Sequence, residues 1–338
     1  MRTDEDKIRV RHRQIRRIAS FVVMSCLLLG MFFLAVNTGS LKVSLRELVR
    51  GLFVEYNETV STIFDLRFPR IIIAMLSGAG VAVSGALFQA VLKNPLADPG
   101  IIGISSGASF VTVLCIAVLP QLYFFTPLFA FLGGVFAFFL VYSLSWKGGL
   151  SPLRIILVGV AINAMFTGLT ETFNALSGGN IERMVAVASG NISMKTWDDV
   201  RTLFPYTLAG LILACVFSGK CDLLSLEDRT ARSLGVNVNQ TRLLLSLIAV
   251  CLASISTAVA GAISFLGLIV PHIGRILVGS EHRVLIPFSM LFGAFAFLVA
   301  DTIGRTIAAP AEISPAICMS VVGGPFFVFL LRRTKKYQ

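Results

Sequence analysis

Long apolar runs dominate this chain, and short polar segments separate one run from the next. A helix needs about 20 mostly apolar residues to cross the hydrocarbon core of a bilayer. The pattern predicts ten such helices, near residues 18–36, 71–92, 101–119, 123–146, 153–176, 203–218, 243–262, 263–279, 285–304 and 314–331. Two of them depart from a continuous apolar helix, because 101–119 is rich in Gly and Ser and 263–279 contains Pro271.

Composition agrees with a protein that crosses a membrane several times. Of the 338 residues, 56% are hydrophobic and 14% are charged, and the mean hydropathy is +0.84. An average soluble domain carries about 25% charged residues. Intrinsic disorder is excluded because a disordered chain has too little apolar surface to bury. The expected fold class is therefore an all-α polytopic membrane protein.

The positive charge predicts how the chain is oriented. Basic residues cluster in 1–17 and 332–338, and the formal net charge is +11. Lys and Arg concentrate on the cytoplasmic side of membrane proteins, so both ends are expected inside and the number of spans must be even. With ten spans, 20 of the 29 Lys and Arg residues lie inside. The predicted organisation is a cytoplasmic basic segment 1–17, a ten-helix transmembrane domain 18–331 and a cytoplasmic basic tail 332–338.

The same basic clusters bear on the partner class. They lie between apolar runs, whereas a nucleic-acid-binding protein gathers its basic residues on one solvated face. Contact with anionic lipid is therefore expected and nucleic acid is not. Two predicted external segments, 37–70 and 177–202, are polar enough to be solvated surface.

The longest predicted cytoplasmic connection, 219–242, has the pattern of a short amphipathic helix. Ser225 followed by Asp228 resembles a capping box. Three apolar residues share one side, and Gly235 is a typical helix stop. Such a helix could fold onto its own membrane domain or dock a cytoplasmic partner, and the pattern alone favours neither. The three apolar residues are Leu226, Ala231 and Leu234.

Two patterns within the apolar runs concern packing and a passage. In 71–92, small residues recur every four positions from Ala74 to Ala86, which predicts close helix packing. In 94–100, two prolines break the helix before the Gly- and Ser-rich stretch 103–108. Non-helical backbone at membrane depth must be buried in protein or line a water-filled cavity. The break therefore predicts either the border of a translocation pathway or a tight cytoplasmic turn.

Ionisable residues inside the spans are few. Asp301 and Arg305 are four residues apart and could pair on one helix face or anchor the helix at an interface. Glu171 is the one acidic candidate for ion coupling. The six Cys and three His lack metal-ligand spacing, and the chain contains no GxxxxGK[ST] phosphate-binding loop. No catalytic, metal or cofactor site is expected, so a nucleotide-driven motor would have to be another chain.

Several motifs together resemble the FecCD family, the permease subunits of type II ABC importers for ferric siderophores, haem and cobalamin. The resemblance runs from about residue 60 to the C-terminus. It rests on Arg67–Arg70, Leu76–Ala79, Ser84–Gly85, Gln89, Asn94–Pro99, Gly103–Ala108, Ala231–Val236, Gly261–Arg275, His282–Arg283, Ala300–Asp301, Arg305, Glu312 and Gly323–Phe327.

The resemblance implies an assembly in a bacterial cytoplasmic membrane. It comprises two ten-helix permease subunits, identical or paralogous, two cytoplasmic ATPase subunits that hold ATP and Mg, and an extracytoplasmic binding protein. It also implies roles for three sets of residues. Outer-rim arginines that dock the binding protein match Arg67, Arg70 and Arg305. The loop 222–238 that enters the ATPase cleft matches through Leu226, Glu227, Ala231, Arg232, Leu234 and Gly235. The cytoplasmic gate matches Asn94 and Leu96 and, more loosely, Ser151 and Pro152.

The favoured hypothesis is a non-catalytic permease subunit of an ATP-driven importer. Its first expected substrate is a ferric siderophore, because the stretches Ser189–Ser193 and Leu96–Pro99 are spelled as in siderophore members of the family. Haem or cobalamin is the alternative substrate. A different class, the ion-coupled secondary transporter, would need acidic or His relays near the bilayer midplane.

Overall fold

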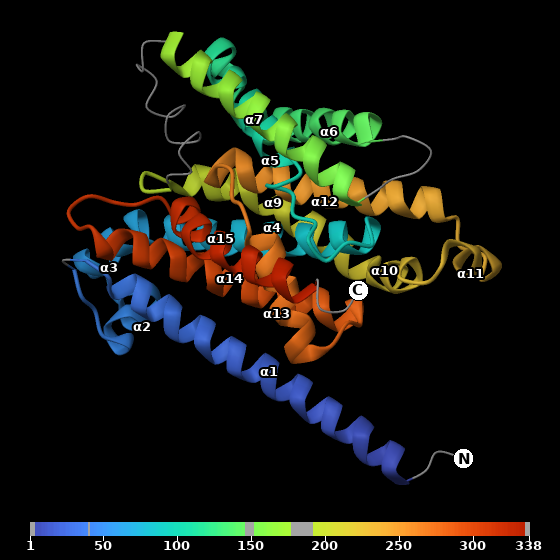
Figure 1. Ribbon diagram of the computed structural model, residues 1–338. Helices are drawn as coiled ribbons and strands as arrows, with labels where there is room; N and C mark the ends of the chain where they lie inside the picture. Colours follow the sequence, from blue (N-terminus) through green and yellow to red (C-terminus); the bar gives the residue numbers. More distant parts are fainter. Residues whose placement is uncertain (1–3, 40, 146–151, 177–191, 335–338) are drawn as a thin grey trace.

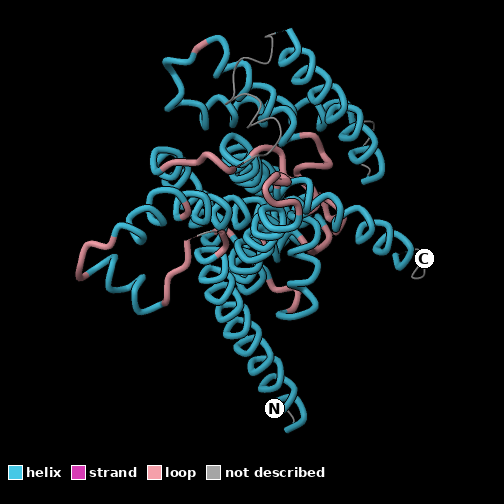
Figure 2. Tube along the Cα trace, turned by 90° about the vertical axis from the view of Figure 1, so that its left-hand side faces the viewer, coloured by secondary structure: helices cyan, strands magenta, loops and turns pink. Residues whose placement is uncertain are grey.

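The computed structural model describes residues 4–39, 41–145, 152–176 and 192–334, and within them the chain forms helices and loops without a strand (Figures 1 and 2). The α-helices and the single 3-10 helix η1 are α1 (Asp4–Asn37), α2 (Leu45–Phe53), α3 (Glu58–Leu66), α4 (Phe68–Val91), α5 (Ile104–Val118), η1 (Pro120–Phe125), α6 (Thr126–Ser145), α7 (Pro152–Leu176), α9 (Trp197–Val216), α10 (Ser218–Leu224), α11 (Asp228–Ser233), α12 (Val238–Ala260), α13 (Leu266–Val278), α14 (His282–Ile307) and α15 (Pro315–Thr334).

Every apolar run predicted to span the membrane coincides with a helix in the described part of the chain. Seven helical segments there are long and apolar enough to cross a bilayer. The other three, α5, α13 and residues 315–330, are shorter. Two of these are the segments with the Gly/Ser-rich and Pro-interrupted patterns. The all-helical polytopic class is confirmed, while the count of ten crossings and the cytoplasmic position of both ends stay predictions.

Helix α4 forms the centre of the bundle. It is buried along nearly its whole length and contacts α14, α12, α13 and α9. Helix α1 lies along one side of this core, and α6 and α7 lie on the opposite side (Figure 1). The first α-helical residue of α1 is Asp4, so the basic segment 1–17 continues directly into the first apolar run.

The small residues of α4 allow helix backbones to approach closely, as the four-residue spacing predicted. A Cβ added at Gly78 would lie 2.3 Å from the carbonyl oxygen of Gly293 in α14, and one added at Gly293 would lie 2.4 Å from that of Gly78. No side chain fits in this gap. The α4–α14 contact is therefore made between the two backbones, which is how helices associate where lipid supplies no hydrophobic drive.

The polar segment 37–70 is largely helical, which the polarity of the segment did not predict. It forms α2 and α3, and α3 ends directly before α4. Ser44 and Glu47 form a capping box at the start of α2, in which the Glu47 backbone N–H donates to Ser44 Oγ and the Ser44 N–H donates to the Glu47 carboxylate. The spacing of these two residues was the sequence signal for this helix.

A substitution at the α4–α14 contact tests this packing. We expect Gly78→Ala to destabilise the protein by about 1–3 kcal/mol, because the added methyl must displace backbone. The measurement is the midpoint of thermal unfolding in detergent. Gly30→Ala is the matched control, since no atom lies within 4 Å of a Cβ at Gly30. Equal midpoints for the two variants would contradict the close backbone contact.

Candidate functional site

One end of the bundle holds an arginine cluster, defined here as Arg70, Asp301, Arg305 and Glu312. The buried Arg70 guanidinium lies 2.8 Å from Asp301 Oδ1 and donates a hydrogen bond of 2.9 Å to Glu312 Oε2. Arg305 Nε lies 3.2 Å from Asp301 Oδ2, so the predicted Asp301–Arg305 pair is confirmed. The Asp301 side chain has 0% exposure. The cluster thus links α4, α14 and the connection between α14 and α15.

Glu312 is the member of the cluster that the sequence connected to no partner. Burial by itself raises the pKa of this carboxyl, but hydrogen bonds from Ser193 and Arg70 and the nearby charges of Arg70 and Arg305 outweigh it and lower the pKa below its ordinary value. Glu312 therefore stays ionised at neutral pH. The sequence offered one signal for this contact, an acid shortly after the helix that carries Asp301 and Arg305. That signal could be used only once the chain was known to reverse direction after α14.

Arg67, the third predicted docking arginine, lies close to the cluster in the chain but has different partners. It ends α3, is half-buried, and donates hydrogen bonds through Nη1 to the backbone oxygens of Val36 and Leu41, the latter at 2.8 Å. The structure thus gives all three predicted arginines partners within the chain. Arg70 and Arg305 face buried acids, whereas Arg67 faces neutral carbonyls.

The broken segment after α4 forms a gate turn, defined here as Asn94–Gly103. Asn94 Oδ1 accepts the Leu96 N–H at 3.0 Å, and the buried Asp98 carboxylate accepts the N–H groups of Gly100 and Ile101 at 2.9 and 3.2 Å. These bonds satisfy backbone groups that the prolines remove from a helix. The non-helical backbone is therefore held within protein, as its place between two apolar runs requires.

A buried glutamine joins the gate turn to α13. Gln89 Nε2 donates to the carbonyl oxygens of Ala97 and Gly267 at 3.3 and 3.1 Å, and Arg275 in turn donates to Gln89 Oε1. Gln89 appeared among the sequence motifs without a role. Its three bonds make the gate turn and the start of α13 one hydrogen-bonded unit.

The predicted gate residues are placed in part. Asn94 and Leu96 lie in the gate turn, Pro152 begins α7, and Ser151 lies outside the described residues. Helix α7 reaches the gate turn through Gly159, where an added Cβ would lie 2.9 Å from the Cα of Ile102. Gly159 is thus a contact that the sequence patterns did not single out.

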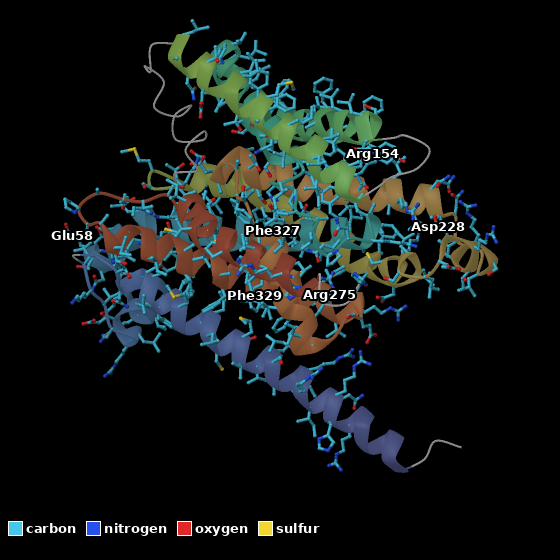
Figure 3. All side chains as sticks on the ribbon, in the orientation of Figure 1. Glu58, Arg154, Asp228, Arg275, Phe327 and Phe329 are labelled. Atoms are coloured by element: carbon cyan, nitrogen blue, oxygen red, sulfur yellow. The ribbon has the colours of Figure 1, made fainter. Side chains whose placement is uncertain are left out.

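The coupling loop, residues 222–238, projects at the end of the bundle opposite to α3, as the positions of Asp228 and Glu58 in Figure 3 show.

The capping box predicted at Ser225 and Asp228 is wrong. Ser225 ends α10, and its hydroxyl donates to the Cys221 carbonyl at 3.2 Å. Helix α11 begins at Asp228. The Asp228 carboxylate binds Lys93 and Arg242 and does not cap the N-terminus of the helix.

The predicted stop at Gly235 is confirmed. Gly235 has a φ of +80°, its N–H donates to the Arg232 carbonyl, and the Val236 N–H donates to the Ala231 carbonyl. These two bonds close the C-terminus of a helix in a Schellman motif. Of the predicted apolar side, Ala231 is buried while Leu226 and Leu234 are exposed. The exposed members of the predicted docking set are Leu226, Glu227, Arg232, Leu234 and Gly235.

Two aspartates attach the coupling loop to the bundle. Asp228 Oδ1 accepts hydrogen bonds from Lys93 and Arg242, and Asp222 Oδ1 accepts the His282 backbone N–H at 2.9 Å. The hydrogen bond from Lys93 lowers the pKa of Asp228, and burial opposes it. The nearby charges of Arg242 and Lys93 lower the pKa further, so the net shift is downward. Asp228 is therefore fully ionised at neutral pH. Among the residues with described positions, no group of three His, Cys, Asp or Glu could hold a metal ion.

The sequence and the fold both match known transport proteins. A family model described as the FecCD transport family matches residues 27–333. The protein named Probable heme-iron transport system permease protein IsdF, from Staphylococcus aureus strain MSSA476, is 42% identical over 316 residues, which cover 94% of this chain and 96% of that protein. IsdF from strain Newman matches to the same extent.

Two solved structures share the fold. An inward-facing metal-chelate type ABC transporter superposes with a TM-score of 0.76 at 28% identity, covering 92% of this chain and 98% of that one. PsaBC from Streptococcus pneumoniae, solved in complex with Fab, gives a TM-score of 0.59 at 17% identity, with coverages of 85% and 95%. The second match, at this identity, speaks for the fold alone.

Neutralising the central acid of the arginine cluster tests its structural weight. We expect Asp301→Asn to lower the free energy of unfolding by about 3–5 kcal/mol, because it leaves Arg70 and Arg305 buried with too little opposite charge. Asp198→Asn is the control, since Asp198 pairs with Arg201 at exposures of 80% and 77%, and such a pair contributes less than about 1 kcal/mol. Equal thermal midpoints in detergent for the two variants would show that the cluster does not stabilise the fold.

Proposed function

We propose, from the premise that this chain belongs to the FecCD transport family, that it is the permease subunit through which an ABC importer moves haem iron across the bacterial cell membrane. The observation that supports haem iron as the substrate is the 42% identity to IsdF over 94% of this chain. The match covers nearly the whole of both chains, which supports the same substrate for this chain.

This assignment replaces the siderophore expected first from the sequence. That expectation rested on Leu96–Pro99, which lies in the gate turn, and on Ser189–Ser193, of which only 192 and 193 lie among the described residues. The haem alternative is supported by a relative that aligns with most of the chain, so haem is the preferred substrate.

The proposed partners fit the two ends of the bundle. ATPase subunits, which would hold ATP and Mg, would dock on the coupling loop, where Leu226 and Leu234 are 38% and 61% exposed. A binding protein would dock near Arg67 and the arginine cluster, and a second permease subunit would complete the passage. The chain itself would make and break no covalent bond. It would open and close a path between states set by the ATPase subunits.

An ion-coupled carrier is the competing class. Its one acidic candidate in a span, Glu171, is exposed on the surface of α7 in the single chain. Two acids among the described residues, Asp301 and Asp98, have 0% exposure. Asp301 is paired with Arg70 and Arg305, and Asp98 accepts backbone N–H groups of the gate turn. A relay needs an acid that is open to a passage, and both of these carboxylates are buried against partners within the chain. The ATP-driven class is therefore the one proposed.

Transport by the reconstituted assembly tests the substrate. In proteoliposomes that contain this chain, its permease partner, the ATPase subunits and the binding protein, we expect uptake of haem that requires ATP. Ferric siderophores at the same concentration should be taken up at background level. Uptake of a siderophore in preference to haem would overturn the substrate assignment. Uptake that persists without ATP and stops when the proton gradient is collapsed would instead favour the ion-coupled class.

A charge reversal at Arg67 tests the docking end. We expect Arg67→Glu to slow association of the binding protein at low salt by about tenfold, because steering between opposite charges speeds encounter by at least that factor. Arg67 is the informative position, since reversal of Arg70 would also break its buried ion pairs. Arg201→Glu is the control, an exposed arginine at the start of α9. Association rates measured by surface plasmon resonance that are equal for both variants would remove Arg67 from the docking surface.

A further inference from the structure

The coupling loop and the gate turn are joined by a charged contact. Lys93, the residue directly before the gate turn, donates hydrogen bonds through Nζ to the Leu226 carbonyl oxygen at 2.6 Å and to Asp228 Oδ1 at 3.0 Å. Both acceptors belong to the coupling loop. A single lysine side chain therefore connects the segment expected to meet the ATPase with the segment expected to form the gate.

The carboxylate of Asp228 is shared by two membrane helices. Arg242 Nη2, near the start of α12, donates to the same Oδ1 atom at 2.9 Å. Lys93 follows α4 and Arg242 lies in α12, so Asp228 lies between the two helices that pack together at the centre of the bundle. A displacement of α11 therefore acts on both helices through one atom.

The backbone at Lys93 supports a specialised role for its side chain. Its φ is +50°, a left-handed conformation that residues with a Cβ seldom adopt. Such conformations persist where the surroundings over-determine them and they cluster at functional sites. At this position the chain leaves α4 and enters the gate turn, while the side chain turns to the coupling loop.

Beyond Lys93 the gate turn is a stiff unit. The Asn94 backbone N–H donates to the Gln89 carbonyl at 3.1 Å, and Gln89 binds both Ala97 and Gly267 through its side chain. Asp98 then holds the second half of the turn. Lys93 is thereby connected through a series of hydrogen bonds to both halves of the gate turn and to the start of α13.

The other end of the loop is attached elsewhere. Asp222 Oδ1 accepts the His282 N–H at 2.9 Å and lies 2.7 Å from His282 Nδ1, which fastens α10 to the start of α14. Helix α10 thus has its own anchor, and α11 reaches the gate turn through Asp228. The loop is therefore attached to the bundle at two separate places, through Asp222 to α14 and through Asp228 to Lys93 and α12.

We propose that Asp228 is a positioning residue for transport: it binds Lys93 and thereby transmits movement of the coupling loop to the gate turn. The role rests on the proposed function, since it requires an ATPase that moves the loop. It adds to that function a named pair of residues through which movement set by the ATPase subunits reaches the gate turn. The competing view is that Lys93 and Asp228 form a surface ion pair without a role in transport. It predicts that either charge can be removed without loss of coupling.

Variants of the complete transporter that remove or keep the charge of this contact separate the two views. Asp228→Asn and Lys93→Gln should each reduce the substrate moved per ATP by about two- to fivefold, the range that an exposed ion pair supports. The double variant should lose no more than either single variant, because residues that act through one contact are not additive. The conservative variant Lys93→Arg, which keeps a cation beside Asp228 and a donor for the Leu226 carbonyl, should keep most of the coupling.

Glu281→Gln is the matched control. Glu281 lies directly before α14 and forms a partly exposed ion pair with Arg17 of α1 at 2.8 Å, so the pair includes no residue of the coupling loop or the gate turn. This variant should keep the wild-type amount of substrate per ATP. Thermal midpoints measured for every variant identify any that fail to fold. Wild-type coupling in both single variants, or losses that add in the double variant, would overturn the proposal.

A second readout does not depend on the identity of the substrate. Stimulation of ATP hydrolysis by the binding protein should fall toward the basal rate in Asp228→Asn and Lys93→Gln and stay near the wild-type level in Lys93→Arg. If the wild-type transporter shows this stimulation but moves no haem, the haem assignment fails while Asp228 is still judged by the stimulation. Full stimulation in both single variants would overturn the role of Asp228 whatever the substrate is.

Discussion

The backbone contact between α4 and α14 is the interaction on which the rest of the structure depends. Gly78 and Gly293 let the two helices meet without side chains between them, and this close approach brings Arg70 of α4 within reach of Asp301 of α14. Inside a membrane the apolar surfaces of two helices gain nothing by leaving lipid for each other, so close packing and satisfied polar groups must hold them together. One pair of helices supplies both.

Helix α4 also connects the two functional ends. Arg70 lies in its first turn, and Lys93 follows its last turn. The arginine cluster and the gate turn are therefore attached to the same buried helix, about 36 Å long at 1.5 Å per residue for its 24 residues. Because α4 packs on α12, α13 and α14, a movement at either end cannot be absorbed by α4 alone. It must shift packed neighbours together, as interlocked helices do.

The charged residues at the two ends of α4 differ in how deeply they are buried. Arg70 and Arg305 are buried and each faces an acid, since an unpaired charge there would be very unfavourable. Lys93, Asp228 and Arg242 are partly exposed, so their contacts are weaker and can be exchanged as the loop moves. The buried cluster is suited to holding helices in place, while the exposed contact is suited to a segment that changes position.

What the sequence determined by itself was local: the apolar runs that became helices, the small-residue stripe of α4, the break at Asn94–Gly103, the stop at Gly235 and the four-residue pair Asp301–Arg305. Each depends on residues close together in the chain, where helical periodicity and turn chemistry decide the outcome. Only the tertiary structure decided that Glu312 joins Arg70, that Gln89 ties the gate turn to α13, and that Asp228 binds Lys93 instead of capping α11. These contacts join residues up to 242 positions apart, and no local pattern records which distant partner a charged side chain will meet.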